Sequence, residues 1–354
     1  MYRLCDKAAA LQPYIVDTNN YRIRLDANES FLQPTQTDLD AMQAAAAEVV
    51  LRRYPDPAAT ELCSAFAKQY RVPEQLVTAG NGSDELISVI FSAFLQKDNT
   101  VVTVAPDFSM YRFYAQLAEK QCVVFQKADD LTLDVTALLH TMEQSKARML
   151  IFSNPCNPTS LGITADQVRT LIRGTDALVV LDEAYMDFWD QSLLAEVEQY
   201  DNLIILRTCS KALGLAALRI GFAVANPKLT AVLQAAKSPY NCDSVTAAMA
   251  SVILNNPLYR EVYLPILCQS RDMLLQGAQA LQQQGLITRV FSTCTNFVFI
   301  EMPRADAVFE DLKDCGILVR CFGDRYLRIT AGTESENREV LAYLKVFAER
   351  MMKK

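Results

Sequence analysis

The chain has 354 residues, 51% of them hydrophobic and 21% charged, which is enough apolar material for a large folded core. The formal net charge of -7 repels the phosphate backbone of nucleic acids, and no basic patch offsets it, so we expect no nucleic-acid partner. The longest apolar runs have the length of strands and are too short to cross a bilayer, so we expect no membrane span.

The ten cysteines and the single histidine narrow the chemistry further. The cysteines are scattered without a Cys-x-x-Cys pair, which favours free thiols in a reducing compartment. The first residues lack the continuous apolar stretch of a signal peptide, so we expect a cytoplasmic protein. His140 lies in a predicted polar-faced helix, and a metal site or histidine-based hydrolysis is therefore not expected. Catalysis must then use lysine, tyrosine, aspartate or a cofactor.

The predicted elements divide the chain into three parts. Residues 1–35 contain prolines and asparagines and predict an irregular N-terminal arm. Residues 36–256 alternate short aliphatic runs with helical patterns, which predicts a large α/β domain with a mainly parallel sheet covered by helices. Its expected strands are 76–78, 101–104, 122–125, 149–152, 178–181, 203–206 and 220–224. Residues 257–354 begin with a long amphipathic helix (259–284) and continue with short strands near 296–300 and 326–329, which predicts a smaller α+β domain.

A glycine-rich turn at residues 79–85 lies between a predicted strand and a helix that begins near Asp84. Such a turn presents backbone N–H groups and a helix N-terminus to a phosphate. It also partly matches the dinucleotide-binding fingerprint, although Glu85 stands where the third glycine is needed. By itself, the segment is equally consistent with an ordinary tight turn.

Two Asn-Pro steps follow the predicted strand 149–152. The prolines fix an extended, rigid loop that can hold the amide of Asn157 in a cleft. Taken alone, a structural turn is the better interpretation of this segment.

Asp182 ends a buried apolar strand, and Tyr185 follows three residues later. A carboxylate in that place requires a positive partner, such as a protonated ring nitrogen. The alternative is an acid that caps the following helix.

Lys211 follows another buried strand and is flanked by small residues, where a solvated lysine is out of place. A desolvated lysine amine forms Schiff bases readily. Ser210 and Arg219 offer a hydroxyl and a fork of N–H donors that suit a phosphate dianion. A loop lysine paired with an acid is the alternative interpretation.

In this order, the four segments resemble fold-type I pyridoxal-phosphate (PLP) enzymes and, among them, the histidinol-phosphate aminotransferase family. Segments 25–29, 54–57, 239–241 and 327–330 are also similar to family sequences, so the resemblance covers nearly the whole chain. It implies an α/β fold with a seven-stranded, mainly parallel sheet in the large domain. It also implies a homodimer with its sites at the interface.

The resemblance implies a role for each of the motif residues. Lys211 would hold PLP as a Schiff base and move the substrate proton, while Asp182 would pair with the ring nitrogen. Asn157 and Tyr185 would bond the phenolic oxygen of the ring, and Phe108 would stack on its face. The remaining cofactor-binding set would be Gly82, Ser83, Asp84, Thr208, Ser210 and Arg219, with Tyr54 from the partner subunit.

Arg328 resembles the residue that binds the acidic group of the substrate, with help from Arg320, Tyr14 and Asn28. That group is a phosphate in histidinol phosphate and a carboxylate in an ordinary amino acid, and an arginine binds either. The implied small-molecule partners are an amino donor and a 2-oxo acid.

The sequence departs from the family pattern at three positions. Ser160 and Ala217 stand where glycines are usual, and Phe108 stands where a tyrosine is common. If the loop needs a positive φ at residue 160, serine costs about 1 kcal/mol there.

The expected activity is transamination between histidinol phosphate and 2-oxoglutarate. Aminotransferases for aromatic or other amino acids and threonine-phosphate decarboxylases remain alternatives, because the sequence does not report which Cα bond lies perpendicular to the cofactor ring. A dinucleotide-binding protein that uses the glycine turn is an alternative from another class. A PLP-fold protein with a regulatory role is a further alternative.

Overall fold

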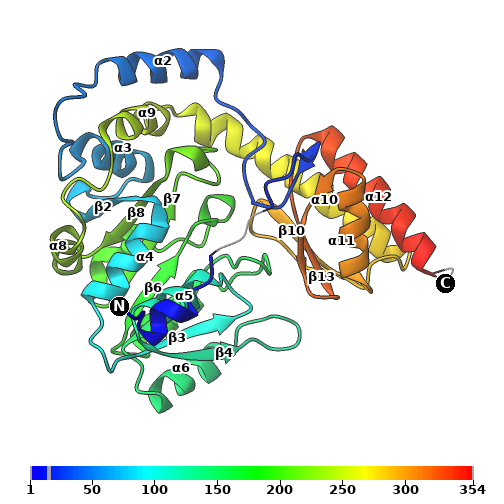
Figure 1. Ribbon diagram of the computed structural model, residues 1–354, viewed down its shortest axis with the longest axis horizontal. Coiled ribbons are helices and arrows are strands. Elements are labelled where there is room, and N and C mark those ends of the chain that lie inside the picture. Colours follow the sequence, from blue (N-terminus) through cyan, green and yellow to red (C-terminus); the bar gives the residue numbers. More distant parts are fainter. Residues whose placement is uncertain (1, 14–16, 353–354) are drawn as a thin grey trace.

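Seven strands form the central sheet of the computed structural model, which describes residues 2–13 and 17–352 (Figure 1). β8 runs in the direction opposite to the other six strands, which all run the same way. The prediction of a mainly parallel sheet is therefore confirmed. Each expected strand is present close to its expected bounds. In spatial order the strands are β2 (Val77–Asn81), β8 (Ile220–Ala225), β7 (Leu203–Thr208), β6 (Leu178–Asp182), β5 (Met149–Ser153), β3 (Thr100–Ala105) and β4 (Gln121–Gln126).

Helices cover both faces of this sheet, and alternate side chains of a strand enter different cores. Val179 and Ile205 belong to one core, whereas their neighbours Val180 and Ile204 belong to the other. Burial on both faces explains why these strands are apolar throughout. The first core takes side chains from α2 (Gln36–Ala47), α3 (Thr60–Tyr70), α6 (Val135–Gln144), α7 (Ala165–Arg173) and α9 (Ser244–Leu254), and the second from α4 (Gly82–Ala93), α5 (Met110–Leu117) and α8 (Pro227–Ala236).

A second, four-stranded antiparallel sheet has its own hydrophobic core, to which Leu274, Val298, Leu327 and Val340 contribute. This separate core agrees with the expected smaller domain, while the boundaries at residues 36 and 257 stay predictions. The strands are β12 (Arg320–Phe322), β13 (Tyr326–Thr330), β10 (Phe297–Glu301) and β9 (Arg289–Val290), and the helices are α10 (Leu264–Gln283), α11 (Ala305–Asp314) and α12 (Glu334–Met352). A π-helical turn, Tyr259–Tyr263, precedes α10, so the predicted helix 259–284 is not α-helical throughout.

The N-terminal arm is less irregular than its sequence predicts. It contains a short helix, α1 (Asp6–Ala10), and a strand, β1 (Ile23–Arg24), which pairs in parallel with β11 (Ile317–Leu318). Lys7 in α1 pairs with Glu119 of the large domain at 3.6 Å, whereas Ile23 in β1 belongs to the core of the small sheet (Figure 1). The expectation of an irregular arm is wrong for these residues, because β1 depends on a partner strand far away in the sequence.

No helix in the described part of the chain is both long and apolar enough to span a membrane.

Candidate active site

The ends of β5, β6 and β7 meet at one edge of the large sheet, where open α/β sheets bind their ligands. Ser153, the last residue of β5, lies opposite Asp182, the last residue of β6. The segments that follow these strands carry Asn157, Tyr185 and Lys211. The fold therefore brings three of the motifs found in the sequence to one place.

Asp182 is a buried carboxylate, with 4% of its surface exposed. Its Oδ2 accepts a hydrogen bond of 2.8 Å from the hydroxyl of Tyr111, and its Oδ1 accepts one of 3.0 Å from the backbone N–H of Ala184. Among the described residues, no cationic side chain forms an ion pair with it. Burial raises the pKa of Asp182 to about 7. The site thus offers a buried acid whose charged form calls for a cation.

Lys211 is half-buried, and its Nζ donates a 2.8 Å hydrogen bond to the carbonyl oxygen of Ala27 in the arm. The amine also lies 5.9 Å from the centre of the Tyr185 ring. Burial, with a further effect of the Arg328 guanidinium, lowers the pKa of Lys211 to about 8. A large share of these amines is therefore uncharged at mildly alkaline pH, as a nucleophile for an aldehyde must be.

The first turn of α4 lies against the guanidinium of Arg219. The Arg219 guanidinium donates to Ser210 Oγ and to Asp84 Oδ2, each at 3.4 Å. Gly82 has a φ of +75°, and a Cβ there would lie 2.6 Å from Arg219 Nη2. A Cβ on Gly221 would lie 2.3 Å from the backbone nitrogen of Ser83. Glycines at both positions therefore keep the turn and the guanidinium close enough to hold one phosphate.

Arg328 connects the small sheet to this edge of the large one. It is 7% exposed, and its guanidinium donates to Oδ1 of Asn157 and to the carbonyl oxygen of Asp26. Its charged group lies 5.4 Å from the ring centre of Phe297. Arg320 pairs with Arg328 across β12 and β13 and is exposed. Directly opposed residues share a sheet face, so both arginines project from the same face of the small sheet.

Asn28 ties the arm to both sheets. Its side-chain amide donates a 2.8 Å hydrogen bond to the hydroxyl of Tyr185, and its backbone N–H donates to Thr330 Oγ1 at 3.0 Å. The carbonyl oxygen of Asn28 accepts from Asn296 at 3.1 Å. Burial raises the pKa of Tyr185 to about 12, so the phenol stays protonated at neutral pH.

Residues 22–344 match the family model described as aminotransferase class I and II. The chain is 35% identical over 333 residues to the histidinol-phosphate aminotransferase of Clostridium kluyveri. The aligned region covers 93% of this chain and 94% of the relative. It is 37% identical over 338 residues to that of Clostridium novyi, covering 94% of both chains. The chain belongs to the histidinol-phosphate aminotransferase family.

Solved structures of this family and its neighbours share the fold. The histidinol-phosphate aminotransferase from Sinorhizobium meliloti, in complex with pyridoxal-5'-phosphate, has a TM-score of 0.89 at 23% identity and covers 99% of each chain. The L-threonine-O-3-phosphate decarboxylase from Porphyromonas gingivalis has a TM-score of 0.75 at 21% identity, covering 92% of this chain and 99% of that one. The expected fold-type I architecture is therefore confirmed.

The other predicted site residues of the aminotransferase have the following surroundings. Phe108 packs edge-on against Tyr111, with ring centres 5.5 Å apart. Thr208 Oγ1 accepts a 3.1 Å hydrogen bond from the backbone N–H of Ser210. Tyr54 is 80% exposed and stacks on Tyr240, so within one subunit it faces solvent. Tyr14 lies outside the described residues.

Sequence reasoning missed residues that support the motifs of this aminotransferase. Tyr111, which bonds Asp182, carries no motif of its own, although it stands three residues after Phe108 at the start of α5. Asp107 accepts a 3.1 Å hydrogen bond from the backbone N–H of Ser153 and a second bond from its hydroxyl. Ser153 Oγ in turn accepts from the N–H of Asn157 at 3.2 Å. An acid shortly after a predicted strand was the available signal for Asp107.

The structure bears out the conditional expectation for the loop that carries Asn157. Ser160 has a φ of +60°, the conformation in which a serine is strained relative to glycine. Its hydroxyl donates a 2.8 Å hydrogen bond to the carbonyl oxygen of Ser292, which offsets part of that strain.

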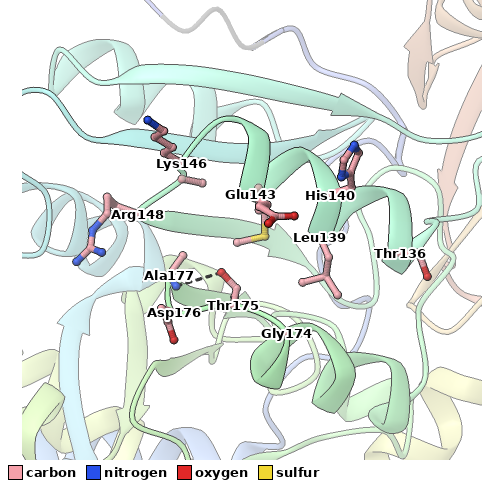
Figure 2. A pocket seen from close by; sticks show the side chains of 12 residues that line it. Thr136, Leu139, His140, Glu143, Lys146, Arg148, Gly174, Thr175, Asp176 and Ala177 are labelled. Carbon is pink, nitrogen blue, oxygen red and sulfur yellow. Dashed lines mark hydrogen bonds between the residues drawn. The ribbon is translucent and has the colours of Figure 1, made fainter.

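A cavity of about 560 Å³ between α6 and α7 lies apart from the motif residues of the aminotransferase (Figure 2). Figure 2 shows the side chains of His140, Lys146 and Arg148 pointing in different directions, so they do not converge on a common ligand. His140 is exposed and contacts Gln144 at 2.8 Å. The residues that the structure describes contain no group of three or more side chains suited to a metal ion.

Proposed function

We propose that this protein transfers the amino group of histidinol phosphate to 2-oxoglutarate, with PLP as its cofactor. The observation that carries the proposal is the buried carboxylate of Asp182, whose pKa is raised to about 7 at a strand end. A buried acid without a cationic side chain beside it suits a ligand that brings its own positive charge. The protonated ring nitrogen of PLP has that charge.

The residues around Asp182 fit the rest of the cofactor. Arg219, Ser210 and the N-terminus of α4 would hold the phosphate, and Gly82 leaves room for the Arg219 guanidinium beside the turn. Tyr185 and Asn157 would bond the phenolic oxygen, and Phe108 would cover one face of the ring. When bound, PLP supplies an aldehyde that links to amines and a ring that withdraws electrons from the substrate Cα.

The chain's own groups would bind the donor and move its proton. Lys211, with its pKa lowered to about 8, can take a proton from the substrate Cα at Nζ and give it back at neutral to mildly alkaline pH. Arg328 would bind the donor's phosphate with two N–H groups, exchanging its contacts with Asn157 and Asp26 for the ligand. The exposed guanidinium of Arg320 would add a second positive charge.

We also propose a homodimer in which Tyr54 reaches the partner subunit's phosphate site. Tyr54 is 80% exposed and Leu51 is 82% exposed, which is unusual for large apolar side chains on one short segment. Burial against a second copy would remove this surface from water.

The free thiols of the ten cysteines support a cytoplasmic location. The two separate hydrophobic cores support the domain division near residue 257.

A donor screen with 2-oxoglutarate as acceptor tests the proposal. Histidinol phosphate, phosphothreonine, aromatic amino acids and histidinol would each be supplied, and glutamate and carbon dioxide would be measured. We expect glutamate from histidinol phosphate and no carbon dioxide from any donor. Carbon dioxide from phosphothreonine without loss of the keto acid would point to a decarboxylase, and turnover of aromatic amino acids alone would reject the proposed donor.

A further inference from the structure

Glu85, which breaks the dinucleotide fingerprint, bonds the turn between β2 and α4 at residues 79–82, which we call the phosphate turn. Its Oε2 accepts a 2.6 Å hydrogen bond from the backbone N–H of Asn81 and a 2.8 Å bond from the side-chain amide of Asn241. The side chain of Asn81, the N-cap of α4, forms no capping hydrogen bond. Glu85 thus fixes the residue that precedes α4, whose N-terminus would bind the phosphate.

Asn241 fastens the end of β2 to the first turn of α4. Besides bonding Glu85, its Nδ2 donates to the carbonyl oxygen of Ala79 at 3.0 Å. Both bonds require the NH2 end of the amide to face the turn. The other end, Oδ1, accepts a 2.9 Å hydrogen bond from Nζ of Lys237. An ammonium only donates, so Lys237 determines which way the amide of Asn241 points.

Lys237 is buried, with 7% of its surface exposed, and none of the described carboxylates forms an ion pair with it. Its Nζ also donates to the carbonyl oxygen of Pro57 at 2.7 Å. Pro57 lies three residues after Tyr54, whose ring stacks on Tyr240 at 4.6 Å between centres. One ammonium therefore bonds both the exposed segment at residues 54–57 and the amide that holds the phosphate turn.

We propose that Lys237, Asn241 and Glu85 are positioning residues that couple the segment at residues 54–57 to the phosphate turn, so that a partner subunit seated on that segment strengthens phosphate binding. This inference rests on the proposed function in taking the ligand to be the phosphate of PLP. The three residues act through the turn, since each bonds the protein and leaves the ligand to the helix N-terminus and Arg219.

The first experiment compares ligands with and without the phosphate. Cofactor-free wild-type protein, K237M and E85Q would be titrated with PLP, with pyridoxal and with inorganic phosphate. Loss of one hydrogen bond from a charged group is expected to weaken binding of PLP and of phosphate about tenfold. Pyridoxal, which has no phosphate, should bind equally well to all three proteins. K228M is the matched control, because Lys228 is exposed on α8, the helix that ends directly before Lys237.

The second experiment measures the coupling by sedimentation. Reciprocity requires that a ligand whose affinity rises on dimerisation also tightens the dimer. Inorganic phosphate should lower the dimer dissociation constant of wild-type protein and of K228M, and should change that of K237M and E85Q much less. E85Q serves as the second variant if K237M does not fold.

The outcomes separate this inference from the proposed function. Equal weakening of PLP and pyridoxal in the variants, or unchanged binding of phosphate, would overturn the inference. A wild-type protein that binds phosphate but not PLP would defeat the proposed cofactor, and the phosphate data would still decide the role of Lys237. Binding of neither ligand would defeat both.

Discussion

Tyr111 donates the hydrogen of its phenol to Oδ2 of Asp182, at 2.8 Å between the two oxygens. Tyr111 is 1% exposed, and its own pKa is raised well above the ordinary value by burial, so it remains a donor throughout the usable pH range. The bond favours the charged form of Asp182 and so lowers its pKa, whereas burial raises that pKa by a larger amount. The carboxyl group is thereby poised to lose its proton when a cationic ring enters.

Tyr111→Phe removes this donor and keeps the ring. The pKa of Asp182 should rise further, because a hydrogen bond to the charged form is lost. We expect kcat/KM to fall about tenfold, the value of one bond to a charged group, and the acid limb of the pH profile to move to higher pH. Tyr114→Phe on the same helix is the control. An unchanged pH profile in the Tyr111 variant would contradict this account.

Asp182→Asn should stabilise the cofactor-free protein while it weakens cofactor binding. The pKa of Asp182 is about 7 in the folded state against 3.8 for the ordinary group. The folded state therefore holds more protons than the unfolded state between these pH values, and stability falls as pH rises through that window. At pH 8 the buried charge of Asp182 therefore lowers the free energy of unfolding by about 4 kcal/mol. Denaturant unfolding should show a higher free energy of unfolding for Asp182→Asn than for wild-type protein at pH 8, and little difference near pH 4.

Asp187→Asn provides the contrast for that measurement. Asp187 accepts a 2.6 Å bond from the buried guanidinium of Arg207, which also pairs with Glu183 at 3.0 Å. Removal of this charge leaves Arg207 partly unpaired. The free energy of unfolding of the variant should therefore fall by about 3 kcal/mol at pH 8. A loss of stability in Asp182→Asn as well would show that the Asp182 charge is already compensated in the cofactor-free protein.

Lys211 should take up PLP at a rate that follows its lowered pKa. The uncharged fraction of an amine with a pKa of about 8 rises about tenfold between pH 7 and pH 9 and then levels off. Incorporation into cofactor-free protein, trapped with borohydride and located by peptide mapping, should show this dependence. An ordinary, solvated lysine would continue to gain reactivity above pH 9. Label on other lysines, with none on Lys211, would contradict the assignment.

The motif residues were predictable because each stands next to a strand whose apolar pattern is plain in the sequence. Asp182 and Lys211 follow strands that are buried on both faces, and parallel strands bring their ends to one edge. Their supporting contacts were not predictable in the same way. The bond from Tyr111 to Asp182 spans 71 positions, and the pairing of β1 with β11 joins residues 23–24 to residues 317–318. Contacts of this kind depend on the assembled fold and leave no local pattern.

Arg328→Lys should discriminate between donors with and without a phosphate. The guanidinium presents two N–H groups from a buried position, and an ammonium cannot reproduce that fork. We expect kcat/KM for histidinol phosphate to fall about a hundredfold, which corresponds to about 3 kcal/mol of lost binding in the transition state, while the low activity with histidinol should change little. Arg325→Lys is the control, because Arg325 pairs with Glu301 on the surface of the same sheet. An equal loss for both donors would mean that Arg328 acts by holding Asn157 rather than by binding the phosphate.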